Sequence, residues 1–242
     1  MRILAIFLCL LLVASFVIST GIAEEDEKKS YKVESIAVGD TIQLPPPRTS
    51  SSFSIEQVIA ERRSVREFTD AVISLEKLSQ LLWSGQGITD DRRGYRAAPS
   101  AGAKYPLEIY VFVGNVQDIP IGLYRYFPYE HQLIVVANYD RRRDLARSIP
   151  PNQIDRILET PVVFVIGAVM ERTTRKYGTT RGPRYVYIEA GAAAENIMLQ
   201  AQALYLDTLM WGAFDDNFVY KACRMDREEP ILIMPIGYKK KL

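Results

Sequence analysis

The chain reads Arg62-Arg63-Ser64-Val65-Arg66-Glu67-Phe68 just after a segment that is expected to form a short helix. Three guanidinium groups thus stand beside one hydroxyl. Arginine offers a planar fork of donors that matches phosphate oxygens and keeps its charge at any working pH. A basic run of this kind is, however, more often a solvated surface turn. The rest of the sequence must therefore decide between a phosphate site and a solvated turn.

The N-terminus has the zones of a secretory signal: Arg2, an apolar run over residues 3–18, and small residues up to Ala23. The apolar run is shorter than the roughly 20 residues that span a bilayer, which favours a signal peptide over residues 1–23, with an uncleaved N-terminal anchor as the alternative. The protein is then expected to be extracytoplasmic, either secreted or associated with a membrane through this segment. Cys9 lies inside it, so Cys223 alone would remain and no internal disulfide is expected.

Charge argues against a nucleic-acid partner. The chain has 30 basic and 29 acidic residues, and cleavage after Ala23 would remove one Arg and no acid, which leaves 29 of each sign. A neutral chain has no overall attraction to nucleic acid, so its local arginine clusters are better interpreted as specific anion sites.

His131 is the only histidine of the chain. A Ser-His-Asp triad or a multi-histidine zinc site would have to be built around it, and we assign no metal ligands. The surrounding sequence predicts a hairpin turn between strands at 123–127 and 133–136, with His131 as an ordinary surface residue. If the chain is an enzyme, it is expected to take its chemistry from a cofactor.

The remaining pattern predicts one α+β domain over residues 54–242, preceded by a flexible arm rich in Pro and Ser over 24–53. Ser54 and Gln57 fit a capping box, which predicts a helix over 55–62. Further helices are expected from Ser74 to Gly85, within 140–160, over 185–206 and over 215–225. Further strands are expected over 107–113, 162–166 and 231–234, and a strand that runs into a loop over 209–214. Residues 84–106 are expected to form a long loop. The helix over 185–206 is expected to be buried, either within one subunit or at a dimer axis.

Four other segments accompany the arginine run, in a fixed order along the chain. They are Pro99-Ser100-Ala101-Gly102-Ala103-Lys104-Tyr105-Pro106-Leu107-Glu108, Lys176-Tyr177-Gly178, Glu189-Ala190-Gly191 with Glu195-Asn196, and Trp211-Gly212-Ala213-Phe214 with Pro235-Ile236-Gly237-Tyr238-Lys239. Together the five segments resemble the FMN-dependent nitroreductase superfamily, and within it the SagB-type dehydrogenases, whose founding members oxidise azoline rings in modified peptides. The resemblance implies a nitroreductase-like FMN-binding domain, a mostly antiparallel sheet flanked by helices, and a homodimer with flavins at its interface.

The resemblance also implies a role for each segment in binding FMN. Arg62, Arg63 and Ser64 would hold the phosphate and ribityl chain, with Lys239 as a further phosphate ligand, and Arg66 would lie near the flavin ring. The turn of Pro99, Ser100, Ala101 and Gly102 would reach the flavin from the neighbouring subunit. Gly212 and Ala213 would present a backbone N–H to flavin N5, and Glu189 and Gly191 would lie at the start of the central helix.

Lys176 and Tyr177 distinguish this branch from ordinary nitroreductases, and the resemblance implies that they are catalytic. They would take a proton while hydride leaves for FMN, with Lys176 uncharged beforehand, which burial or neighbouring arginines would favour. A mobile surface loop is the alternative for this segment.

We therefore expect an FMN-dependent oxidoreductase that transfers hydride through flavin N5 and acts on a small molecule or a modified peptide. An NAD(P)H-dependent nitro or quinone reductase on the same fold is one alternative, and a non-catalytic flavin-binding protein is another.

Overall fold

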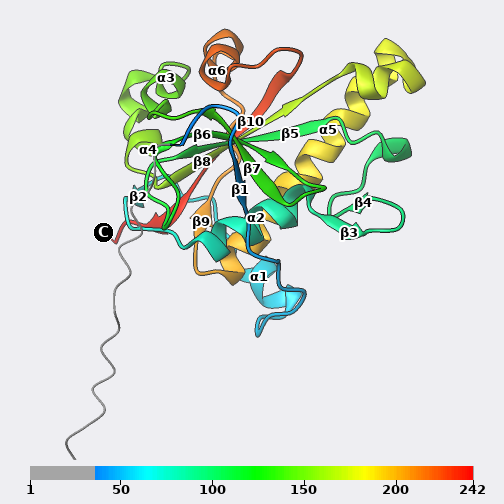
Figure 1. Cartoon of the computed structure of the whole chain (residues 1–242). Helices are drawn as coiled ribbons and strands as arrows, with labels where there is room; N and C mark the ends of the chain where they lie inside the picture. Colours follow the sequence, from blue (N-terminus) through cyan, green and yellow to red (C-terminus); the bar gives the residue numbers. More distant parts are fainter. Residues whose placement is uncertain (1–35, 242) are drawn as a thin grey trace, which may run out of the picture. The chain divides into compact units, whose positions relative to one another are not determined.

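The computed structural model describes residues 36–241 (Figure 1). The predicted signal segment, residues 1–23, and the first part of the predicted arm, residues 24–35, lie outside the described residues. Among the residues that are described, none of the helices combines the length and the apolar character that a membrane crossing needs.

An eight-stranded sheet forms the centre of the domain, in the order β1-β7-β6-β5-β8-β10-β2 with β9 beside β10 (Figure 1). All of its hydrogen-bonded neighbours run antiparallel, which confirms the predicted α+β class and the mostly antiparallel sheet. The strands are β1 Thr41–Gln43, β2 Phe68–Thr69, β5 Leu107–Val113, β6 Gly122–Phe127, β7 Gln132–Ala137, β8 Val162–Ala168, β9 Asp207–Thr208 and β10 Glu229–Lys239.

Strand β8 shows how the core is divided. All of its residues are buried, and alternate ones enter different hydrophobic clusters, because successive side chains of a strand point to opposite faces. Phe164 packs with the helices α2 and α5 on one face, and Val163 and Val165 pack with α3, α4 and α6 on the other. The sheet is therefore covered by helices on both faces, which explains its near-continuous apolar strands.

The helices are α1 Ile55–Glu61, α2 Leu75–Gln86, α3 Arg142–Ala146, α4 Asp155–Leu158, α5 Glu171–Ala203 and α6 Asp216–Cys223. The capping box that starts α1 is confirmed, since Gln57 N donates to Ser54 Oγ and Ser54 N donates to Gln57 Oε1. The predicted end of α2 at Gly85 is wrong, because α2 continues to a cap at Gly87. Gly85 is internal, and a Cβ there would stand 2.8 Å from Cδ1 of Ile197, so it permits close packing of α2 on α5.

Helix α5 begins at Glu171, well before the predicted start at 185, so that start is wrong. Gly178 and Pro183 caused this error because both usually end a helix. Gly178, with φ 75 and ψ 167, kinks the chain between two helical sections, and Pro183 lies inside the second section. Lys176 and Tyr177 therefore lie on a helix.

Residues 84–106 are more ordered than the predicted loop. They contain the hairpin of β3 Ile88–Asp90 and β4 Tyr95–Arg96, followed by the 3-10 turn η1 Ala101–Ala103. Asp90 fixes the hairpin turn, because its Oδ1 accepts from the backbone N–H groups of Arg92 and Arg93.

The predicted flexible arm is wrong from Thr41 to Arg48. Strand β1 pairs with β7, Leu44 is 3% exposed, and Arg48 exchanges two hydrogen bonds with the side chain of Gln80 on α2. The alternation of polar and apolar residues from Thr41 to Leu44 suits an edge strand, which the nearby prolines concealed.

His131 occupies the predicted hairpin turn, but the expectation of an ordinary surface residue is wrong. Its ring is half-buried, with Nδ1 2.8 Å from Tyr126 Oη and Nε2 2.7 Å from Ser79 Oγ and 3.0 Å from the carbonyl of Pro45. His131 thus joins the turn to α2 and to the segment that follows β1.

Candidate active site

The arginine run begins where α1 ends, as predicted, with Arg62 as the C-cap. Ser64 forms a bridge with Thr208, and the N–H of Val65 donates to the Thr208 carbonyl. The end of the run lies along the last residues of β10, since Lys239 pairs with Phe68. The structure therefore brings the arginine run and Lys239 side by side, and their role in phosphate binding stays a prediction.

The three guanidinium groups of the run make local contacts. Arg62 Nε is 3.6 Å from Glu195 Oε1, and Arg63 Nη1 donates to the carbonyls of Ala60 and Arg62. Arg66 Nη1 donates to the Ser64 carbonyl at 3.4 Å. Each guanidinium has five N–H donors, so these contacts leave donors for an anion.

A cavity of about 660 Å³ lies beside Gly191 on α5 and Gly212 in the loop after β9. A Cβ added to either glycine would have nothing within 4 Å, so bare backbone faces open space at both positions. Ala213 follows Gly212 and is exposed. The other lining residues are Tyr187, Ala190, Met210, Phe214, Asp216, Asn217, Tyr220, Glu228, Glu229, Pro230, Ile231 and Leu232. All charged residues among them are acidic.

The arginine run and this cavity lie near each other. Ser64 pairs with Thr208, which precedes Gly212 by four residues. Four extended residues span at most about 14 Å. A cation cluster and an open cavity therefore lie within reach of one elongated ligand that carries an anionic end and a flat end.

The turn after Pro99 packs against Lys176 and Tyr177 of the same chain. Gly102 has φ +62, and a Cβ on it would stand 2.6 Å from Tyr177 Oη and 2.7 Å from Lys176 Nζ. Ser100 precedes the turn, and its Oγ accepts from Tyr105 N at 2.8 Å. Lys176 is exposed, so of the two effects named for it, burial and neighbouring arginines, burial is absent. The turn begins at Ala101. The same chain thus supplies both the turn and the Lys-Tyr pair that contacts it.

Glu189 lies deep within α5, so its predicted place at the helix start is wrong. Its side chain is 2% exposed and lies near Ser100, Arg96 and Gln86 rather than at the cavity of Gly191. Burial raises the pKa of Glu189 to about 7, against the opposing effects of the nearby Ser100 hydroxyl, the charge of Arg96 and the nearby Gln86 amide.

Arg96 and Gln86 are site residues that the sequence reasoning missed. Arg96 Nη1 donates to Gln86 Oε1 at 2.9 Å, and burial lowers the pKa of Arg96 despite nearby carboxylates. Their only signal in the sequence was their position within the predicted loop over 84–106, a segment rich in glycine.

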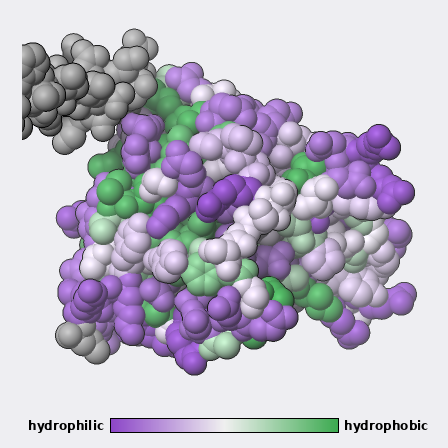
Figure 2. All heavy atoms as spheres, turned by 90° about the horizontal axis from the view of Figure 1, so that it is seen from below, coloured by the Kyte–Doolittle hydropathy of each residue, from purple (hydrophilic) through white to green (hydrophobic). Residues whose placement is uncertain are grey.

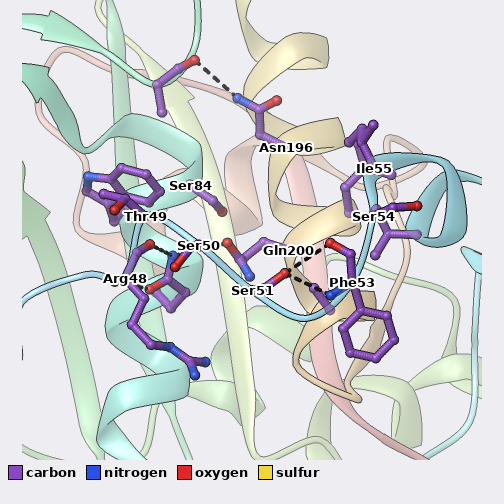
Figure 3. Close-up of a pocket in the computed structure, with 16 residues that line it drawn as sticks. Arg48, Thr49, Ser50, Ser51, Phe53, Ser54, Ile55, Ser84, Asn196 and Gln200 are labelled. Atoms are coloured by element: carbon purple, nitrogen blue, oxygen red, sulfur yellow. Dashed lines mark hydrogen bonds between the residues drawn. The ribbon is translucent and has the colours of Figure 1, made fainter.

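A smaller cavity of about 360 Å³ lies between residues 48–55, α2 and α5 (Figure 3). Ser50, Ser51 and Gln200 are among its polar lining residues (Figure 3). Asn196, on the same cavity, donates to the carbonyl of Ala97 at 3.3 Å and so joins α5 to the chain just before Pro99. None of the predicted site residues lines this cavity.

The larger cavity, with bare backbone on two sides and an arginine run nearby, is typical of a domain that holds a flat cofactor ending in a phosphate. The residues present fit FMN in this respect. The Nitroreductase family matches residues 59–238, most of the chain, and the chain belongs to that family. It is accordingly an oxidoreductase of the nitroreductase superfamily with a nitroreductase-like fold.

The similarity of this chain to individual proteins agrees with the family match. The nitroreductase-type protein MJ1384 of Methanocaldococcus jannaschii is 40% identical over 202 residues, which cover 84% of this chain and 99% of that protein. The microcin B17-processing protein McbC of Escherichia coli is 26% identical over 171 residues, 68% of this chain and 62% of McbC. A nitroreductase structure from Ralstonia eutropha JMP134 superposes with a TM-score of 0.71 at 26% identity and covers 87% of this chain and 92% of its own. McbC supports a SagB-like branch for this chain within the superfamily.

Proposed function

We propose that the chain is an FMN-dependent dehydrogenase of the SagB type, which oxidises its substrate by hydride transfer while Lys176 and Tyr177 accept the proton. One observation carries this proposal: the turn at Gly102 packs directly against Lys176 Nζ and Tyr177 Oη. The turn is one of the five segments that resemble the superfamily, and the Lys-Tyr pair is the segment that distinguishes this branch. The fold brings the two into contact.

FMN, when bound, supplies a hydride acceptor at N5. The residues that would hold it are Arg62, Arg63, Ser64, Arg66 and Lys239 toward the phosphate, and Gly191, Gly212 and Ala213 toward the ring. Glycine at the latter positions lets backbone approach a flat ring without a side chain in between. The open space beside Gly191 and Gly212 supports this assignment.

Lys176 and Tyr177 would act as the proton-accepting pair. A general base must lie within hydrogen-bonding reach of the proton that it removes. The kink at Gly178 ends the short helical section that carries the pair, and the rings of Tyr177 and Tyr185 pack edge to face at 4.8 Å across it. This packing fixes the direction of Tyr177 while Lys176 stays exposed to an incoming substrate.

A homodimer is part of the proposal. Helix α1 exposes Ile55 (56%) and Ile59 (57%), and α5 exposes Tyr187 (55%) and Ile188 (61%). Figure 2 shows apolar patches among polar side chains on the face seen from below. Exposed apolar surface of this kind is typical of protein contacts. In such a dimer the turn at Pro99 and Gly102 of one chain would reach the flavin held by the other.

A modified peptide is the proposed substrate class, with a small molecule as the alternative. McbC is named for processing microcin B17, and this name supports the peptide. Export through residues 1–23, with possible membrane association, remains the proposed localisation.

An NAD(P)H-dependent nitro or quinone reductase is the second candidate function, supported by MJ1384. A flavin-binding protein without turnover is a third candidate, and the contact of Lys176 and Tyr177 with the turn speaks against that.

Two variants test the proposal. Arg63→Ala is expected to weaken FMN retention, and Lys176→Ala is expected to retain FMN but to slow its reduction by a thiazoline-containing peptide. Arg143→Ala serves as the control, because its side chain is exposed on α3 and does not line the cavity. Rapid reduction of the bound FMN by NADPH, unaffected by Lys176→Ala, would favour the reductase.

A further inference from the structure

The Lys-Tyr pair lies at the end of a short helical section of α5. This section begins at Glu171 and ends at the kink of Gly178, so Lys176 and Tyr177 are its last residues. A helix keeps its direction through an unbroken run of helical backbone, and the kink interrupts that run. The direction of the section, and with it the position of the pair, therefore depends on contacts with other parts of the fold.

Arg172 joins this section to the chain around the turn. Its Nη1 donates to the carbonyl of Tyr105 at 3.0 Å, and its Nη2 lies 2.6 Å from Oε1 of Glu108, on β5. Within the described part of the chain, these are the only side-chain hydrogen bond and the only ion pair that residues 171–177 make. A planar guanidinium fork can serve both partners at once.

Arg172 and Lys176 are four residues apart and so lie on the same face of the helical section. Arg172 meets the chain at Tyr105, just after the turn, whereas Lys176 Nζ would stand 2.7 Å from a Cβ on Gly102, within the turn. One face of the section thus lies along the turn. The Arg172 contact is therefore continuous with the contact on which the proposed function depends.

The backbone beside the turn adopts a conformation that needs support. Ala103 and Tyr105 have positive φ values of 52 and 44, which residues with a side chain rarely adopt. Ser100 Oγ accepts from the N–H of Tyr105, and the guanidinium of Arg96 lies over the Tyr105 ring at 4.6 Å. Arg172 holds the carbonyl of the same residue. Strained backbone persists only where its surroundings fix it, and it gathers at functional sites.

The ion pair of Arg172 contributes little to the stability of the fold. The side chain of Arg172 is 41% exposed, and ion pairs at exposed positions are weak. A displacement of reacting groups by about 1 Å, however, can lower a reaction rate about 100-fold. The same contact is thus minor for stability and important for the place of the pair, so the two effects can be separated by experiment.

We propose that Arg172 is a positioning residue for the Lys-Tyr pair. It holds the section that carries Lys176 and Tyr177 against the turn, and so fixes how far the two reactive side chains lie from Gly102. The inference rests on the proposed function. Arg172 itself neither contacts the substrate nor takes a proton, and it acts through the position of the pair.

Fluorine NMR of the full chain, with fluorotyrosine in place of tyrosine, follows Tyr177 without flavin or substrate. Tyr177→Phe identifies the signal. Arg172→Met removes the guanidinium but keeps an unbranched stem, and it is expected to shift the Tyr177 signal. Arg175→Met is the matched control, because Arg175 is exposed on the same section and makes no ion pair or side-chain hydrogen bond among the described residues. This control is expected to leave the signal in place.

Kinetics separate positioning from binding. Arg172→Met is expected to keep its FMN and its KM for substrate but to slow the reduction of bound FMN about 10–100-fold, because the pair is displaced. Arg172→Lys keeps the charge without the fork, so its rate is expected to lie between that of Arg172→Met and that of the unchanged protein. Arg175→Met should match the unchanged protein. Equal midpoints of chemical denaturation would show that loss of folding does not cause the slower reduction.

A Tyr177 signal that Arg172→Met leaves in place, or that both methionine variants move equally, would overturn the inference. The test of the proposed function is separate. If the protein binds FMN and needs Lys176 for its reduction, but Arg172→Met behaves like Arg175→Met, only the positioning role fails. If the protein binds no FMN, the proposed function fails, while the fluorine signal still shows whether Arg172 fixes the place of Tyr177.

Discussion

The hydroxyl of Tyr177 lies 2.6 Å from the point at which a Cβ on Gly102 would stand. No methyl group can occupy that point unless Tyr177 or the turn moves. Gly102 also has φ +62, a conformation that L residues with side chains rarely adopt. The contact between the turn and the Lys-Tyr pair therefore depends on a glycine at this position.

Gly102→Ala is expected to displace the Lys-Tyr pair and to lower the free energy of unfolding by about 1–2 kcal/mol, through backbone strain. Reduction of bound FMN by substrate is expected to slow as well. Gly39→Ala is the matched control, because Gly39 has φ +96 but nothing within 4 Å of its Cβ position. The control should lose stability without losing activity. Equal activity losses in both variants would contradict a specific contact at Gly102.

Gly191→Ala is expected to raise the free energy of unfolding by about 0.5–1 kcal/mol, because a helical glycine is replaced where nothing lies within 4 Å. Gly85→Ala should instead destabilise, since its Cβ would meet the side chain of Ile197. Chemical denaturation measures both. If the flavin ring occupies the cavity, Gly191→Leu should fold yet retain little FMN. Full FMN retention by Gly191→Leu would place the ring elsewhere.

His131 is expected to make the protein less stable in mild acid. Burial, the larger effect, lowers the pKa of His131 below its ordinary value of 6.5, against the opposing effect of the Pro45 carbonyl. As the pH falls through 6.5, the unfolded chain therefore binds a proton more readily than the folded chain, and the free energy of unfolding falls. Denaturation at several pH values tests this.

His131→Asn is the variant for that test, because asparagine tolerates the φ of 48 at this position. It should cost about 1–3 kcal/mol at neutral pH, since the buried hydroxyl of Tyr126 loses its partner and Ser79 Oγ keeps only its bond to the Pro45 carbonyl. It should also make the free energy of unfolding less dependent on pH below 6.5. If the variant keeps the same pH dependence of the unfolding free energy, groups other than His131 cause that dependence.

Glu189 has the opposite effect on stability. Its folded pKa of about 7 lies above the ordinary 4.5, so between these values the folded chain holds a proton that the unfolded chain has released. The free energy of unfolding therefore falls as the pH rises from 4.5 to 7, and changes little above. Glu189→Gln should remove this decline. Persistence of the decline in the variant would assign it to another carboxyl.

Much of the fold could be predicted from sequence because its signals are local. The Ser54 capping box and the apolar runs of β5 and β8 each contain their own evidence, and all three are confirmed. Strand β1 and the first section of α5 were missed for the opposite reason. Prolines beside β1, and Gly178 and Pro183 in α5, resemble breaks, and only tertiary contacts show otherwise.

The candidate site was predictable in its motifs but not in its buried partners. The five motif segments identified the family, which the family match over residues 59–238 confirms. Arg96 and Gln86 carry no motif, and they lie near Glu189 only because three separate elements come together in the fold. The half-buried environment of His131 likewise depends on Ser79 and Pro45, which lie far away in sequence.

The central claim is that this chain holds FMN between its arginine run and the cavity of Gly191 and Gly212. The most direct measurement is the visible spectrum of the purified full chain, before and after denaturation, with the released chromophore separated and identified. The account predicts a yellow protein that releases FMN, or a colourless one that becomes yellow on addition of FMN and then retains it through gel filtration. A colourless protein that retains no added FMN would contradict the account.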